Sequence, residues 1–98
     1  MKSIISNLNK VFESRIRLGI MAVLIVNDYS DFNTLRETLD VTDGNLASHL
    51  KTLENNKLIR VKKQFIGRKP NTRYLITDYG SQQFNQHLNA LENLIKAK

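Results

Sequence analysis

The sequence predicts a fold of the α+β class, mainly α, in which helices precede a charged β-hairpin and a long helix closes the chain. Apolar residues recur at helical spacing in four segments, residues 14–27, 34–39, 42–56 and 77–96. Between the third and the fourth, residues 58–66 and 72–76 alternate apolar and polar side chains, as strands do. The turn-forming residues Gly67, Pro70 and Asn71 separate these two strands.

The composition predicts a single domain spanning residues 1–98. This length supports one modest hydrophobic core and leaves little room for a second module. The absence of cysteine excludes disulfides and thiolate metal sites. The longest apolar run, residues 20–26, is too short to span a bilayer, and the opening MKSIISNLNK lacks the features of a signal peptide. We therefore expect a cytoplasmic protein with no membrane partner.

Residues that accept hydrogen bonds from backbone N–H groups stand where the first two helices are predicted to begin. Ser14 precedes the first helix, and Asn33 precedes the short second helix. Residues 28–31 between these helices are turn-forming types. In the N-terminal arm, residues 1–13, apolar side chains recur at three and four, which predicts helix there as well. These side chains are Ile4, Ile5, Leu8, Val11 and Phe12.

The third and fourth helices are each predicted to start at a threonine cap. Thr42 opens a helix that ends near Asn56, with Leu46, Leu50 and Leu53 on its core face and Ala47 beside them. Thr77 opens the last helix, residues 77–97. In the two strands between these helices, the inward positions are expected to be Ile59, Val61, Phe65, Tyr74 and Ile76.

The positive charge of the chain is concentrated in the hairpin. The chain has 15 basic and 9 acidic side chains, a net charge of +6. Six of the basic residues, and no acid, lie between Arg60 and Arg73, so the rest of the chain is neutral overall. Such a focused patch is typical of proteins that bind polyanions. The alternative is an edge strand kept soluble by its lysines.

The helix from Thr42 carries small polar groups on the side away from the core. Asn45, Ser48, Thr52 and Asn55 lie on that side, with His49 and Lys51 on its flanks. Short hydrogen-bonding side chains suit the base edges of a major groove. An ordinary solvated face would look the same, but a basic hairpin follows this one directly. Helix, turn, helix and charged hairpin is the order of a winged helix-turn-helix, whose second helix reads duplex DNA.

Three stretches resemble the small single-domain winged-helix transcriptional regulators, compact relatives of the MarR and ArsR families. They are TDGNLASHLKTLENNKLI, GRKPNTRYLIT and LITDYG, and the resemblance covers roughly residues 12–95. It supports DNA contacts at the matching positions and implies a dimer formed through the terminal helices. The DNA-binding residues expected are Thr42, Gly44, Asn45, Ser48, His49, Lys51, Thr52, Lys62, Lys63, Arg68, Lys69 and Arg73. The dimerisation residues expected are Ile4, Leu8, Val11, Leu88, Leu91, Leu94 and Ile95.

Metal and catalytic chemistry have little support in the sequence. His49 and His87 lie on separate predicted helices without the ligand spacing of a zinc site. No nucleophile–base pattern, phosphate loop or carboxylate pair is present, so we expect no cofactor, no metal and no enzyme.

We therefore expect a sequence-specific regulator that binds double-stranded DNA as a homodimeric repressor at a pseudo-palindromic operator. Two alternatives stay open. One is a winged helix used as a protein–protein interaction module without specific DNA binding. The other is a sensor switched by a small-molecule effector, whose identity the sequence does not indicate.

Overall fold

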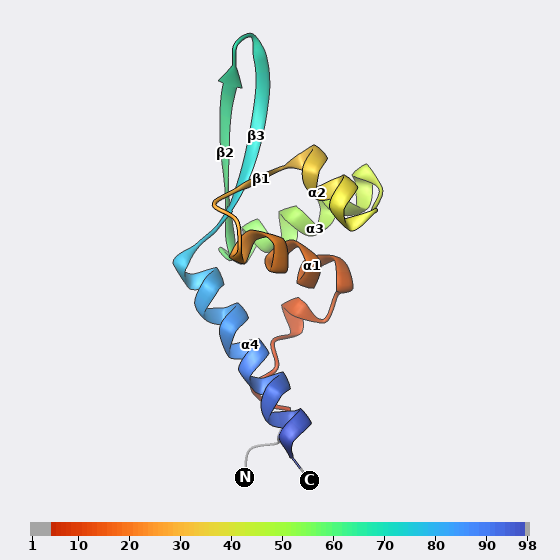
Figure 1. The fold of residues 1–98 in the computed structure, drawn as a ribbon, viewed down its shortest axis with the longest axis vertical. Helices are drawn as coiled ribbons and strands as arrows, with labels where there is room; N and C mark the ends of the chain where they lie inside the picture. Colours follow the sequence, from red (N-terminus) through yellow and green to blue (C-terminus); the bar gives the residue numbers. More distant parts are fainter. Residues whose placement is uncertain (1–4, 98) are drawn as a thin grey trace.

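The computed structural model describes residues 5–97 of the chain as one 3-10 turn, three short α-helices, a small sheet and one long α-helix (Figure 1). The sheet is antiparallel with strand order β1-β3-β2. The hairpin β2–β3 projects from one end of the helical body, and α4 runs away from the body in the other direction. The elements are η1 (Lys10–Phe12), α1 (Arg15–Ile25), β1 (Ser30–Asp31), α2 (Phe32–Leu39), α3 (Asp43–Asn55), β2 (Ile59–Ile66), β3 (Lys69–Ile76) and α4 (Asp78–Lys96).

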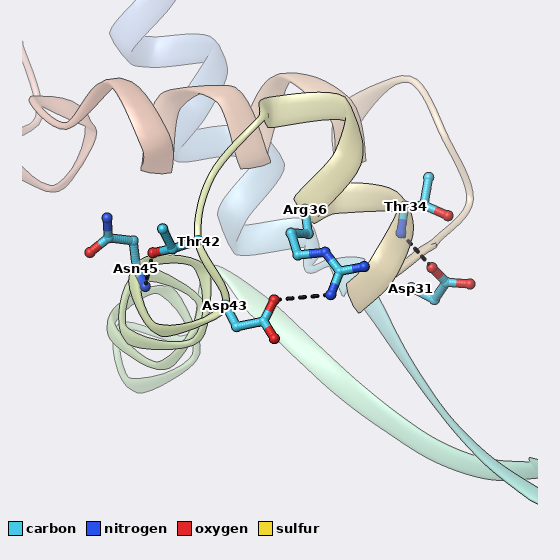
Figure 2. Close-up of polar contacts among 6 residues, drawn as sticks. All are labelled: Asp31, Thr34, Arg36, Thr42, Asp43 and Asn45. Carbon is cyan, nitrogen blue, oxygen red and sulfur yellow. Dashed lines mark hydrogen bonds and ion pairs between the residues drawn. The ribbon is translucent and has the colours of Figure 1, made fainter.

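Three of the four predicted helix caps are confirmed. The side chains of Ser14, Thr42 and Thr77 each accept a hydrogen bond from the backbone N–H three residues later, at 3.3, 3.2 and 2.8 Å. The fourth prediction, Asn33, is wrong. Asp31 caps α2 instead, and its Oδ1 accepts from the Thr34 N–H at 2.8 Å (Figure 2).

The cap of α2 moves because residues 28–31 are not wholly a turn. Ser30 and Asp31 form β1 and pair with Tyr74 and Arg73 of β3. This pairing holds Asp31 in an extended conformation, with φ −88° and ψ 170°, which is the backbone geometry of an N-cap. Because β1 has only two residues and its partner β3 lies far along the chain, no local sequence pattern predicts it.

We expect Asp31→Ala to lower the free energy of unfolding by about 1 kcal/mol, with a smaller loss for Asp31→Asn, which can still cap. Hydrogen bonds from Thr34 lower the pKa of the Asp31 carboxyl from its ordinary 3.8. Its stabilisation is therefore fully present above that value and disappears as the pH falls through the lowered pKa. Urea unfolding at a series of pH values from neutral into strong acid tests both points. A difference between wild type and Asp31→Ala that does not decrease as the pH falls would contradict the assignment.

The hairpin turn and the N-terminal arm also differ from expectation. The strands pair down to Ile66 and Lys69, so Gly67 and Arg68 alone form the loop, and Pro70 lies within β3. Gly67 has φ +63°, which is costly for other residues and fixes the turn there. The arm is a turn followed by the short η1 rather than a regular helix, and residues 1–4 lie outside the described part.

The hydrophobic core lies where α1, α2 and α3 meet the base of the hairpin. Leu46, Leu50 and Leu53 of α3 are buried as predicted, but Ala47 is exposed. Tyr74 and Ile76 pack against the core, whereas Phe65, predicted to face inward, is 73% exposed. The core residues are Phe12, Ile20, Met21, Leu24, Leu35, Leu46, Leu50, Leu53, Leu58, Ile59 and Phe84. Across residues 5–97, no helix is both long and apolar enough to cross a membrane.

Candidate nucleic-acid interface

The exposed face of α3 carries most of the side chains predicted to read DNA. Asn45, Ser48 and Lys51 are exposed on it, as are Thr42 and Gly44 at its start. The Thr52 hydroxyl is less available because it donates to the Ser48 carbonyl at 3.2 Å. Ala47, which the helical pattern placed beside the core, is exposed next to Ser48 and adds a small apolar group to this face.

The start of α3 is fixed against α2 by an ion pair. Arg36 Nη1 lies 3.0 Å from Asp43 Oδ1, and the pair spans the turn between the two helices (Figure 2). Both side chains are substantially exposed, so the pair contributes little stability by itself. It does neutralise the one acid in the first turn of α3, which would otherwise repel a phosphate.

His49 lies at the edge of this face and is held from inside the protein. Its Nδ1 is 3.0 Å from Arg17 Nη1 of α1, and Arg17 Nε donates to the Val11 carbonyl at 2.6 Å. Partial burial and then the charge of Arg17 lower the pKa of His49 below its ordinary 6.5. A neutral ring that accepts through Nδ1 carries its proton on Nε2. His49 therefore connects α3 to α1 and the arm, a contact that no sequence pattern indicated.

The hairpin carries exposed basic side chains along its length. Lys62 and Lys63 lie in the middle of β2, and Arg68 and Lys69 lie at the tip, and all four are exposed. Arg73 differs because its guanidinium is engaged within the protein. It lies 3.9 Å above the centre of the Tyr29 ring, and its Nε donates to Asn71 Oδ1 at 3.3 Å. The sequence predicted the charge at this position but not these partners.

An open groove of about 700 Å³ separates α3 from the hairpin. Lys51 of α3 and Lys63 of β2 lie on its two sides, and Thr72 and Tyr74 of β3 form part of the hairpin wall. Lys51 is paired with Glu54 at 3.6 Å, in an exposed contact that a competing anion can replace. The groove therefore lies between one flank of α3 and the inner half of the hairpin.

The residues predicted for dimerisation lie on α4 and in the N-terminal arm. On α4, Leu91 and Leu94 are half-buried, next to the buried face that Phe84, His87 and Ala90 form. Leu88 and Ile95 are 41% and 83% exposed. In the arm, Leu8 is half-buried and Val11 packs against the core, whereas Ile4 lies outside the described residues.

The two histidines have separate structural partners. His87 is buried, its Nδ1 accepts from the Asn9 N–H at 3.0 Å, and its ring meets Phe12 edge-on at 5.3 Å. His87 thereby fixes the arm to α4, while His49 is bound to Arg17. Within residues 5–97, no group of three potential metal ligands lies together.

Two helices joined by a short turn, of which the second exposes small polar side chains beside a basic hairpin, define the winged helix-turn-helix class. A family model described as "Winged helix DNA-binding domain" matches residues 16–95. The chain therefore belongs to the winged helix DNA-binding domain family, whose fold is that of transcriptional regulators rather than enzymes.

Known proteins resemble this chain in sequence or in fold. The chain is 38% identical over 87 residues to an uncharacterized protein of Methanocaldococcus jannaschii, covering 89% of this chain and 95% of that one. It is similar to a transcriptional regulator homologue of Pyrococcus horikoshii OT3, with 33% identity, a TM-score of 0.84, and coverage of 95% and 90% of the two chains. The Bacillus subtilis protein PadR, solved with operator DNA, shares the fold at 17% identity, with a TM-score of 0.67 and coverage of 76% and 46%.

Proposed function

We propose that this protein is a transcriptional regulator of the MarR/ArsR-like kind that binds a specific duplex sequence, as a homodimeric repressor on a pseudo-palindromic operator. The observation that carries the proposal is that α3, whose polar side chains are exposed, stands beside an acid-free basic hairpin with one open groove between them. Repression requires only that the bound protein occupies the operator, which these surfaces are suited to do.

The two DNA-facing surfaces have different chemical roles in this proposal. Asn45 and Ser48 are short and directional, so they suit base edges once α3 enters the major groove. Lys62, Lys63 and Lys69 are flexible cations suited to phosphates. Lys51 and Lys63 face the groove from both sides, which fits a sugar–phosphate strand passing between α3 and the hairpin.

Two of the residues predicted to contact DNA receive narrower roles. His49 offers one N–H at most, because its other ring nitrogen accepts from Arg17. Its main role is to set the position of α3 relative to α1. Arg73 has its guanidinium stacked on Tyr29 and acts as an anchor for the base of the hairpin. A phosphate contact from Arg73 would require that stack to open.

Titrations against a selected and a scrambled duplex at several salt concentrations test the proposal. If a dimer neutralises about six phosphates, log K should fall with log salt with a slope near −5. Asn45→Ala should cost about 1–3 kcal/mol on the selected duplex and little on the scrambled one. Lys69→Ala should weaken both alike and reduce the slope by roughly one per lost contact.

The matched pair of variants separates the proposal from its rival. Both substitutions are at exposed positions, so neither should change the fold. Equal losses on both duplexes for Asn45→Ala would mean that α3 does not read the sequence. No duplex binding at low salt would favour the interaction module instead.

A further inference from the structure

The tip of the hairpin exposes large apolar side chains among its cations. Phe65 is 73% exposed and Ile66 is 56% exposed, and they are the last two residues of β2 before the loop. Single exposed apolar residues are common on protein surfaces. Here an aromatic ring, an isoleucine and Pro70 occur together at the end of a projecting hairpin, where core packing cannot account for them (Figure 1).

The strand register assigns these side chains to opposite faces of the hairpin. Val61 pairs with Tyr74, Lys63 with Thr72 and Phe65 with Pro70, and alternation along a strand puts these three pairs on one face. The first two pairs line the groove beside α3. Phe65 and Pro70 therefore continue the groove-lining face outward, beyond the point where α3 ends its contact.

Ile66 lies on the other face of the hairpin. Its partner in the ladder is Lys69, and the next pair inward on that face is Gln64 with Asn71. Ile66 thus has nearly the same position along the hairpin and a comparable exposure, but it faces away from the groove. Substitution of Ile66 is therefore a control for effects that depend on the face of the hairpin on which Phe65 lies.

The charges around Phe65 define what could cover it. Lys63 lies on the same face as Phe65, Arg68 lies in the adjoining loop, and Lys62 and Lys69 lie on the opposite face of the hairpin. All four cations are exposed, and no acid occurs between residues 60 and 73. A surface that combines cations with a flat apolar ring fits a polyanion that offers apolar faces between its charges. Duplex DNA has this pattern, since phosphates flank stacked bases, and apolar side chains can enter it as wedges from the minor groove.

We propose that Phe65, supported by Pro70, is an apolar wedge that enters the minor groove next to the α3 site, partly unstacks one base step and bends the duplex. This inference rests on the proposed function and adds a second source of specificity to it. Pyrimidine–purine steps unstack most readily, so the protein should prefer such a step at a fixed distance from the bases that α3 reads.

The test compares wild type, Phe65→Ala, Ile66→Ala and Lys69→Ala on the duplex that wild type selects from a random pool. Each adenine of that duplex is replaced in turn by 2-aminopurine, whose fluorescence rises on unstacking, and energy transfer between labelled ends reports the bend. We expect wild type to raise the fluorescence at one step per half-site. Phe65→Ala should abolish that rise, reduce the bend and weaken affinity about tenfold, the usual scale for losing an aromatic–base stack.

The controls separate a wedge from a charge effect and from damage to the fold. Phe65→Ala should keep the wild-type salt slope because it removes no charge, and its melting temperature should be unchanged because the ring is exposed. Lys69→Ala should lose about 0.9 of slope for a single contact and retain the fluorescent step. Ile66→Ala should retain both the unstacking and the bend.

Two results would overturn the wedge while leaving the proposed function intact. One is a wild-type complex with no unstacked step, or one whose unstacking and bend survive Phe65→Ala. The other is an equal loss of unstacking with Ile66→Ala, which would remove the assignment to the groove-facing side. Absence of duplex binding by wild type would overturn both proposals together.

Discussion

Replacing Gly80 with alanine is expected to reduce the free energy of unfolding by about 3 kcal/mol, the upper part of the usual range for overpacking. For a domain of this size that corresponds to a fall in melting temperature of roughly 12 °C or more. Gly80 is buried in the first turn of α4, where a Cβ would overlap the carbonyl oxygen of Leu58 and approach its carbonyl carbon to 2.8 Å. Both are backbone atoms, so no side-chain rotation relieves the clash.

The clash would also break the connection that places α4. The Thr77 N–H donates to the Leu58 carbonyl at 3.1 Å, and the Thr77 hydroxyl donates toward the Lys57 and Leu58 carbonyls, at 2.8 and 3.1 Å. The same hydroxyl accepts from the Gly80 N–H. Moving α4 outward would stretch these hydrogen bonds and loosen Phe84 from Phe12, whose rings meet edge-on at 5.4 Å. The loss of stability should therefore extend to the base of the hairpin.

Gly44→Ala is the matched control, because nothing lies within 4 Å of a Cβ built at that position of α3. Alanine is the better helix former, so stability should stay level or rise by up to about 1 kcal/mol. If α3 approaches a phosphate or base edge closely at this point, the same substitution should weaken duplex binding. Thermal unfolding of both variants, with a binding titration of Gly44→Ala, measures these effects. A Gly80→Ala protein as stable as wild type would show that the Leu58 contact is not tight.

Local chemistry made much of the fold predictable from the sequence. Ser14, Thr42 and Thr77 cap helices because a hydroxyl and the backbone three residues later need no distant partner. The core face of α3 follows from helical spacing alone, and the charge of the hairpin can be counted directly. The existence and order of α1 to α4, β2 and β3 therefore followed from local patterns, whereas β1 did not.

The predictions from the sequence were wrong where contacts between distant parts of the chain determine the local structure. Asn33 and Asp31 are both good caps, and the choice was made by pairing of β1 with β3. Phe65 continues the inward alternation of β2, but the hairpin extends past the core, so the inward face becomes exposed. The alternation of β2 assigns Phe65 to the correct face of the hairpin, yet the ring is exposed. This indicates that Phe65 has a role other than packing in the core.

The predicted DNA-binding set was limited in the same way. Residue type and helical position identified Asn45, Ser48 and the lysines of the hairpin as available groups, and their exposure agrees. The partners of His49 and Arg73 could not be predicted from local patterns. Arg17 is 32 residues from His49, and Tyr29 lies in a loop far from Arg73 in the sequence. Sequence alone therefore predicts which groups are polar, but not which are already bound within the protein.

The double substitution Leu88→Glu with Ile95→Glu is expected to convert the proposed dimer to monomers and to weaken operator binding at least about 100-fold. The two residues are seven apart, so they lie on one face of α4, and their exposure shows that the body of the domain does not cover them. Leu91 lies between them on that face and is half-buried. A second copy packing its own α4 against this stripe would remove it from water, and a two-fold pair uses the same patch on both chains.

The size of the effect follows from how a dimer reads a palindrome. Two α3 helices held together engage half-sites about 34 Å apart, one turn of DNA. Once the first half-site is bound, the second binds as an intramolecular event, which typically adds a factor of about 10²–10⁴ to affinity without new contacts. Monomers lose this factor, although each keeps its own reading face and hairpin. Binding to a single half-site should therefore stay at the wild-type level.

Sedimentation velocity and titrations against full and half operators provide the measurement, with Val26→Glu as the control. Val26 is 77% exposed at the end of α1, so it tests a new charge on an exposed apolar residue away from α4. That variant should remain dimeric and bind the full operator normally. Because Leu88 and Ile95 are exposed, the double variant should keep the melting behaviour of a folded monomer. A wild-type protein that sediments as a monomer at micromolar concentration, both free and on the full operator, would disprove the dimer and with it the palindromic site.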